Sequence, residues 1–133
     1  MDRVLDRLWI GATEDFRAPL AALGFVGLLD LRDGAGLATP GGVTVHRADL
    51  RDGDPYNAAH VVAALDFVAE RIQYGRVLIA CAAGMSRSAC MTIGYLVKHG
   101  FSVPEAFEAV RAARPRIAPQ ARTLDSVLQA VCR

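Results

Sequence analysis

The sequence has few of the features that mark extracellular, membrane or metal-binding proteins. Its three cysteines are an odd number, too few for a disulfide scaffold, and their spacing matches no zinc motif. No apolar run approaches the ~20 residues that cross a bilayer, and residues 1–14 lack a basic segment followed by an apolar one. We therefore expect a cytoplasmic protein with no membrane contact and no cofactor.

An excess of charge of either sign is also missing. The formal net charge is +1, which argues against binding of nucleic acid through bulk electrostatics. Lysine is nearly absent: the chain has one lysine, Lys98, and fourteen arginines. The planar guanidinium group of arginine suits oxyanions. Hydrophobic residues make up 53% of the 133 residues, enough to bury a core. We expect one domain over residues 1–133, acting as a monomer.

Helix-like and strand-like segments alternate along the chain. Apolar residues at helical spacing after Asn57 predict one helix, and a capping box at Ser102 and Glu105 predicts the start of another. The predicted helices cover residues 13–23, 57–75, 88–99, 102–114 and 119–131, and the predicted strands cover residues 8–11, 25–31, 43–50 and 76–81. This order predicts an α/β fold: a three-layer domain whose central, mostly parallel sheet of four or five strands is flanked by helices.

The segment CAAGMSRS, residues 81–88, carries the most chemical information. A strand delivers Cys81 at its carboxyl end, where ligands of open α/β sheets bind. Backbone N–H groups of a tight loop that enters a helix can cradle an anion, and Arg87 can grip two oxygens of a phosphate. The same positive environment favours the thiolate of Cys81, which is a nucleophile. The hydroxyl of Ser88 could donate to this sulfur when it leaves in a hydrolytic step.

This segment resembles the Cys-x-x-Gly-x-x-Arg-Ser/Thr phosphate loop of the cysteine-dependent protein phosphatases. It is most similar to the small dual-specificity branch, whose loop commonly reads Cys-x-Ala-Gly-x-Ser-Arg-Ser. The resemblance extends to LWIG at residues 8–11, LLDLR at residues 28–32, and the segment from Ile93 to Pro119. It implies the protein tyrosine phosphatase-like version of the α/β fold.

The resemblance also implies a role for each residue of the loop. Cys81 is the nucleophile, Arg87 the phosphate clamp and Ser88 the hydroxyl that aids release of the thiol. The expected phosphate-binding residues are Ala82, Ala83, Gly84, Met85, Ser86 and Arg87. One departure is Ala80, because the family has histidine at this position, where it helps to fix the loop and to keep the thiolate ionised.

A general acid must come from a separate loop, because expulsion of an alkoxide or phenolate needs a proton. Asp49, Asp52 and Asp54 all follow the strand predicted at residues 43–50. Asp52 fits the register of related sequences best, Asp49 second and Asp54 third.

Other chemically active side chains are expected to have ordinary roles. We expect Cys90 and Cys132 to be packing or terminal residues, although Cys90 could act as a resolving thiol. The expected roles of the remaining groups are solvated loop charges for Asp30 and Asp33, a solvated helix face for Arg111, Arg114 and Arg116, and surface or packing positions for His46, His60 and His99.

Taken together, the residues predict a phosphatase that hydrolyses phosphomonoesters through a phosphocysteine. Phosphotyrosine and phosphoserine or phosphothreonine of a protein are the expected substrates, and a small phosphoester, a lipid or an RNA end is not excluded. Two alternatives stay open. A rhodanese-like sulfurtransferase also places a cysteine loop between a strand and a helix, usually with four residues before the closing basic residue rather than five. A catalytically impaired phosphate-binding pseudophosphatase is the reading that Ala80 motivates.

Overall fold

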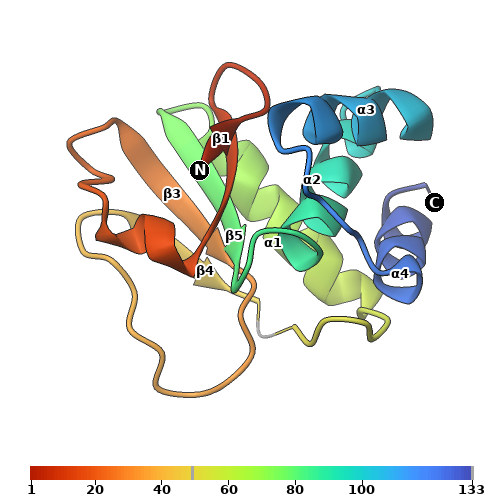
Figure 1. Ribbon diagram of the computed structural model, residues 1–133, viewed down its shortest axis with the longest axis horizontal. Coiled ribbons are helices and arrows are strands. Elements are labelled where there is room, and N and C mark those ends of the chain that lie inside the picture. Colours follow the sequence, from red (N-terminus) through yellow and green to blue (C-terminus); the bar gives the residue numbers. More distant parts are fainter. Residues whose placement is uncertain (49, 133) are drawn as a thin grey trace.

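A mostly parallel β-sheet lies at the centre of the computed structural model, which describes residues 1–48 and 50–132 (Figure 1). The strands of the described residues are β1 (Asp2–Arg3), β2 (Leu8–Ala12), β3 (Phe25–Asp30), β4 (Thr44–Arg47) and β5 (Arg76–Cys81). Their order in the sheet is β1-β2-β5-β3-β4. β1 is antiparallel to β2, and the other neighbours are parallel. The predicted α/β fold is confirmed, with five strands in its sheet.

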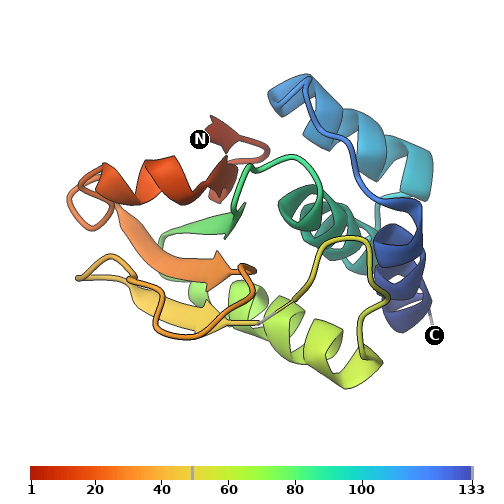
Figure 2. The same ribbon diagram turned by 60° about the horizontal axis from the view of Figure 1, so that its bottom comes forward.

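Helices cover the two faces of this sheet unequally (Figure 2). One face carries α1 (Ala58–Arg71) and α2 (Arg87–Lys98), and α3 (Val103–Ala113) and α4 (Ala121–Val131) pack against α2. The other face carries the short 3-10 helix η1 (Thr13–Arg17) and a smaller apolar cluster. The larger core therefore lies between the sheet and the α-helices, and it fixes where β5 meets α2.

Local signals explain why several helices begin where they do. The side chain of Asn57 accepts a hydrogen bond of 2.9 Å from the N–H of Ala59 and so caps α1. Ser102 and Glu105 form the predicted capping box at the start of α3. In α2, a side chain at Gly94 would clash with Val127 of α4, so glycine lets these two helices pack closely.

Two predicted elements are shorter than expected. The helix predicted at residues 13–23 is only η1, because Pro19 holds Ala18 in an extended conformation with ψ of 153°. Of the strand predicted at residues 43–50, the described residues form only β4, which ends at Arg47, the partner of the last β3 residue, Asp30. Asp49 lies outside the described residues. β1 was not predicted, because two residues are too few for a periodic pattern.

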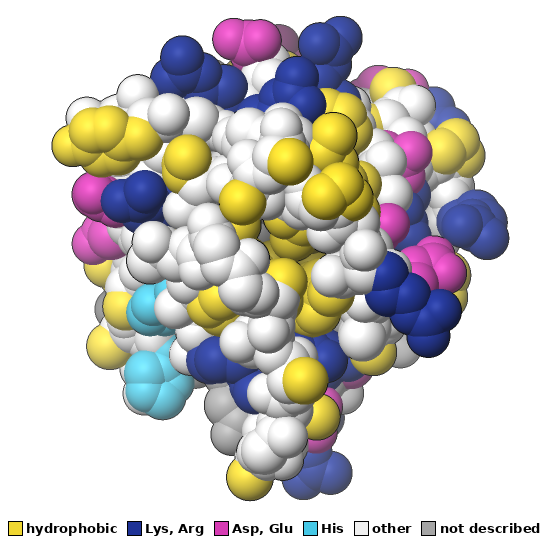
Figure 3. Space-filling model, turned by 90° about the vertical axis from the view of Figure 1, so that its left-hand side faces the viewer, with side chains coloured by type: hydrophobic (Ala, Val, Ile, Leu, Met, Phe, Trp, Pro, Cys, Tyr) yellow, Lys and Arg dark blue, Asp and Glu magenta, His cyan; other side chains and the backbone are white. Residues whose placement is uncertain are grey.

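The surface shows no large field of one charge on the face drawn in Figure 3, where basic and acidic side chains lie interspersed. Within the described residues, no helix combines the length and the apolar character that a membrane span requires.

Candidate active site

The loop of residues 82–86 joins β5 to α2 at the carboxyl edge of the parallel strands. Its turn depends on Gly84, which has φ of +69°, and a side chain there would lie 2.7 Å from the carbonyl oxygen of Gly11. The carbonyl of Ala82 accepts a hydrogen bond from the N–H of Thr13, and that of Met85 from the N–H of Ala118. Segments far apart in the sequence thus hold the loop from outside.

Cys81 lies at the base of this loop with its side chain almost fully buried. Its Sγ lies 3.3 Å from Oγ of Ser88, and the backbone N–H of Ser88 donates to the sulfur at 3.5 Å. Both contacts come from the first turn of α2, where the helix dipole is positive. The structure therefore brings together the expected nucleophile and the expected hydroxyl.

Arg87 is held along one side of its guanidinium group. Its Nη1 donates to the carbonyl of Leu50 at 2.9 Å, to the carbonyl of Leu31 at 3.4 Å and to Oδ1 of Asp33 at 2.9 Å. Within residues 1–48 and 50–132, its Nε and Nη2 groups make no hydrogen bond. These two donors form the edge of the guanidinium group that suits two oxygens of a phosphate.

The expectation of a solvated loop charge is wrong for Asp30, whereas Asp33 is an exposed loop residue as expected. Asp30 is fully buried and accepts hydrogen bonds from Nε of Arg32 at 2.9 Å and from Nη2 of Arg32 at 2.8 Å, and Arg47 lies 3.4 Å away. The hydrogen bonds with Asp30 raise the pKa of Arg32. Asp33 is half exposed but forms an ion pair with Arg87. Asp30, at the end of β3, is thus a buried charge with arginine partners. Asp33, in the segment after β3, supports the site through Arg87.

Asp52 lies beside the phosphate loop. Its Oδ1 accepts a hydrogen bond of 2.5 Å from the hydroxyl of Ser86, and its side chain is exposed. Asp54, the third candidate, offers its backbone carbonyl to Thr123 on α4. Asp49, the second candidate, lies outside the described residues. Of the two candidate acids among the described residues, Asp52 is the one whose carboxylate contacts the loop.

The prediction that Arg114 lies on a solvated helix face is wrong. It is buried, and it donates from Nε to the carbonyl of Gly84 at 2.8 Å and from Nη2 to that of Ala83 at 3.3 Å. Its Nη1 forms an ion pair of 2.7 Å with Asp2. Because these bonds hold two loop carbonyls outward, they favour an inward direction for the loop amides. Arg111 is exposed and pairs with Glu108, as a solvated helix face predicts.

Ala80 and Cys90, two residues near the nucleophile, are both buried and uncharged near neutral pH. Ala80 is fully buried in the smaller apolar cluster, together with Phe25 and Leu28. Cys90 is fully buried in α2, and burial raises its pKa to about 12, with further contributions from Asp52 and Cys81. Cys90 therefore stays a thiol near neutral pH, which disfavours a role as a resolving residue. Cys132 is exposed near the end of the chain.

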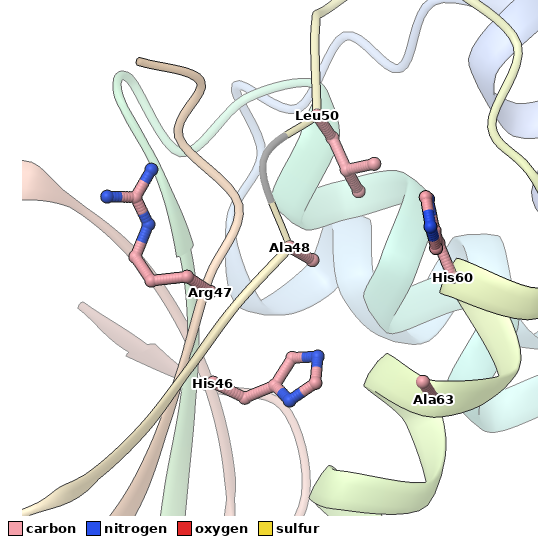
Figure 4. Close-up of a pocket in the computed structure, with 6 residues that line it drawn as sticks. All are labelled: His46, Arg47, Ala48, Leu50, His60 and Ala63. Atoms are coloured by element: carbon pink, nitrogen blue, oxygen red, sulfur yellow. The ribbon is translucent and has the colours of Figure 1, made fainter. Parts of the chain in front are cut away.

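A cavity of about 340 Å³ lies beside Leu50, whose carbonyl accepts a hydrogen bond from Arg87 (Figure 4). It is lined by His46, Arg47, Ala48, Leu50, His60 and Ala63. The ring of His46 stacks on Phe67 with centroids 5.3 Å apart, and His99 stacks on Tyr95. The surface or packing positions expected for these two histidines are confirmed, and the cavity was not predicted. Within the described residues, no group of three His, Cys, Asp or Glu side chains could hold a metal ion.

Known proteins share this loop and this fold. The sequence model described as "Dual specificity phosphatase, catalytic domain" matches residues 50–131. Mouse dual specificity protein phosphatase 14 is 45% identical over 60 residues, which are 41% of this chain and 30% of that protein. The chain thus matches less than a third of that relative's length. The chain belongs to the dual specificity phosphatase catalytic domain family.

Solved structures agree with this membership. The crystal structure of human DUSP28 superposes with a TM-score of 0.83 at 27% identity, covering 97% of this chain and 93% of that chain. The crystal structure of PTPMT1 in complex with PI(5)P superposes with a TM-score of 0.82 at 23% identity, covering 98% of this chain and 93% of that chain. The second likeness concerns the fold.

Proposed function

We propose that this chain is a phosphatase that hydrolyses phosphomonoesters through a phosphocysteine at Cys81, with residues 1–133 as one catalytic domain. The observation that carries the proposal is the position of the sulfur. It lies at the base of a loop that enters α2, beside the hydroxyl of Ser88. Arg87 opens α2 directly after this loop, and its Nε and Nη2 make no hydrogen bond to the described residues. The carboxylate of Asp52 contacts Ser86 of the loop.

Phosphate binding would use the loop and Arg87 together. The backbone N–H groups of Ala82, Ala83, Gly84, Met85 and Ser86 surround the phosphate oxygens, and Nε and Nη2 of Arg87 bind two of them. This arrangement neutralises the charge of the transferring group without a metal ion, so catalysis rests on positioning and electrostatics.

In the first step, the thiolate of Cys81 attacks phosphorus and the ester P–O bond breaks. Asp52 donates its proton to the departing oxygen, which leaves as an alcohol or a phenol. In the second step, Asp52 takes a proton from water, whose oxygen attacks phosphorus. The S–P bond breaks, and Ser88 donates a hydrogen bond to the departing thiolate. The products are the alcohol and inorganic phosphate, and Cys81 and Asp52 return to their starting states.

The substrates are phosphorylated molecules, as family membership implies, and we propose phosphotyrosine and phosphoserine or phosphothreonine of proteins. Asp52 is exposed beside the loop, where the phosphorylated side chain of a protein can reach it. Phosphoinositides also belong in a substrate panel, because PTPMT1 was crystallised with PI(5)P. A cytoplasmic location, a monomeric state and the absence of nucleic-acid and membrane partners stay predictions from the sequence.

The alternatives are not favoured, because the matched family is a phosphatase family. A sulfurtransferase would form thiocyanate from thiosulfate and cyanide. A pseudophosphatase would bind phosphopeptides without turnover.

The test is turnover of an aryl phosphate in the presence of a chelator. We expect hydrolysis that vanadate inhibits competitively, and loss of turnover in Cys81→Ser with phosphate binding retained. Arg87→Ala should weaken vanadate binding and lower the rate, since both use the guanidinium group. Full activity of Cys81→Ser would refute the proposal, and thiocyanate formation without phosphate release would favour the sulfurtransferase.

A further inference from the structure

Thr123, on the first turn of α4, holds the loop that carries Asp52. Its side chain is fully buried, and its Oγ1 both accepts a hydrogen bond from that loop and donates one to it. It accepts a hydrogen bond of 3.1 Å from the N–H of Gly53 and donates one of 2.8 Å to the carbonyl of Asp54. One hydroxyl thus fixes the two residues that directly follow Asp52.

A second hydroxyl of α4 fixes the end of the same loop. Ser126 lies three residues after Thr123, so both side chains lie on one side of the helix. Its Oγ accepts a hydrogen bond of 2.8 Å from the N–H of Tyr56 and donates one of 2.7 Å to the carbonyl of Thr123. The Tyr56 side chain is only 8% exposed, which anchors this end of the loop in the core.

A third hydroxyl joins the carboxylate itself to the phosphate loop. Oγ of Ser86 donates to Oδ1 of Asp52 and accepts a hydrogen bond of 3.1 Å from the N–H of Gln120, the residue before α4. Within the described residues, Oδ2 of Asp52 makes no hydrogen bond. One carboxylate oxygen is therefore fixed in place, while the other can carry the proton for the leaving group.

We infer that Thr123 is a positioning residue for the general acid, and that α4 keeps Asp52 docked at the phosphate loop before a substrate arrives. This inference rests on the proposed function. It follows from the hydrogen bonds that the hydroxyls of Thr123, Ser126 and Ser86 make to residues 52–56, the acid loop. A fixed acid saves the free energy of ordering a mobile loop during each turnover. Movement of the acid loop over the substrate is then not a step of the reaction.

Thr123→Val is the sharpest variant, because valine keeps the shape of the side chain and loses both hydrogen bonds. Gly53 and Asp54 are not buried, so water can replace the lost partners and the fold should persist. We expect turnover of a phosphoserine peptide to fall by roughly 10- to 100-fold, because an acid contributes about 10²- to 10⁴-fold and is only displaced here. Turnover of 4-nitrophenyl phosphate, whose leaving group needs no proton, should stay within about threefold of the unsubstituted protein.

Two further variants separate positioning from a general structural effect. Thr123→Ser keeps the hydroxyl and should restore phosphoserine turnover to near the unsubstituted level. Thr44→Val makes the same chemical change at an exposed position of β4, whose hydroxyl makes no hydrogen bond to residues 52–54 within the described part of the chain, and it should change the turnover of neither substrate. An equal loss on both substrates, no loss on either, or failure of Thr123→Ser to restore turnover would overturn the inference.

Amide hydrogen exchange tests whether Thr123 holds the acid loop, and this test does not require that the chain hydrolyses a substrate. In the unsubstituted protein the N–H of Gly53 should be protected, and in Thr123→Val it should exchange at least about 10-fold faster if the bond to the hydroxyl provides the protection. An unchanged exchange rate would refute this role of Thr123. Absence of turnover in the unsubstituted protein would refute the proposed function instead, so the two failures are distinguishable.

Discussion

At the scale of single residues, Asp52 and Asp54 lie two positions apart but face different partners. The carboxylate of Asp52 contacts the phosphate loop, whereas Asp54 contributes its backbone carbonyl to Thr123. We therefore predict that Asp52→Asn lowers turnover of a phosphoserine peptide by about 10²-fold or more and affects 4-nitrophenyl phosphate far less. Asp54→Asn is the matched control and should leave both rates nearly unchanged. A selective loss in Asp54→Asn, or in Asp49→Asn, would move the acid to that position.

Asp33 is half exposed and forms an ion pair with Arg87, the proposed phosphate-binding arginine. Its ion pair shares Nη1 of Arg87 with two backbone carbonyls, so its own contribution is about 1 kcal/mol or less. We predict that Asp33→Ala weakens vanadate binding by up to about fivefold. Asp33→Asn keeps an oxygen that can accept the hydrogen bond, and it should weaken binding less. Inhibition constants for vanadate measure both, and an unchanged constant in Asp33→Ala would contradict this role.

Cys90 makes stability depend on pH at the alkaline end. Burial raises its pKa from 9.0 to about 12, so the folded protein keeps the proton that the unfolded chain loses. The stabilising contribution is therefore fully present below pH 9 and is lost as the pH rises toward 12. Thermal unfolding of the unsubstituted protein should show a steeper fall over this range than Cys90→Ala. The slopes are compared, since the truncation itself lowers stability, and equal slopes would refute the assignment.

At the scale of elements, the phosphate loop depends on the residue that ends α3. Arg114 binds two loop carbonyls from a buried position. We predict that Arg114→Met lowers the free energy of unfolding by about 2–3 kcal/mol, because those carbonyls lose charged donors. Vanadate binding should weaken too, since the loop amides lose their support. Arg111→Ala, on the exposed side of the same helix, should change stability by no more than about 0.5 kcal/mol. Equal effects of the two variants on unfolding and on vanadate binding would contradict the role of Arg114.

The same scale shows which structure could be predicted from the sequence. Caps such as Asn57 and Ser102 are local signals, and the helices that they start were predicted. The loop of residues 81–88 was also found, because its residue types and their spacing are contiguous. The helix expected at residues 13–23 is wrong, because Pro19 disfavours a helical conformation of Ala18 and the helical segment ends at Arg17.

Contacts between distant segments had no such signal. Arg114 and Gly84 are 30 positions apart, and Thr123 and Gly53 are 70 positions apart. A buried arginine or threonine looks the same in sequence as an exposed one, so its partner depends on the packing of whole helices. The sequence therefore gives no sign that Arg114 supports the phosphate loop or that Thr123 supports the loop of the proposed acid.

At the scale of the whole molecule, the sheet order brings the site together. β5 lies between β2 and β3, so the loop after it is flanked by the segments that follow both neighbours. The segment after β3 supplies Asp33, and the segment after β4 supplies Asp52. α4 closes the arrangement from the helical side. Binding, nucleophilic attack and proton donation can therefore occur at one edge of the sheet.

The central claim is that the phosphoryl group is transferred to the sulfur of Cys81. Trapping of this phosphocysteine tests the claim most directly. The protein is mixed with 4-nitrophenyl phosphate and quenched in acid within the first turnovers, and its peptides are mapped by mass spectrometry. We predict one phosphoryl group on the peptide that contains Cys81, and none there in Cys81→Ser. Steady turnover by Cys81→Ser, or a phosphoryl group on another residue, would contradict the account.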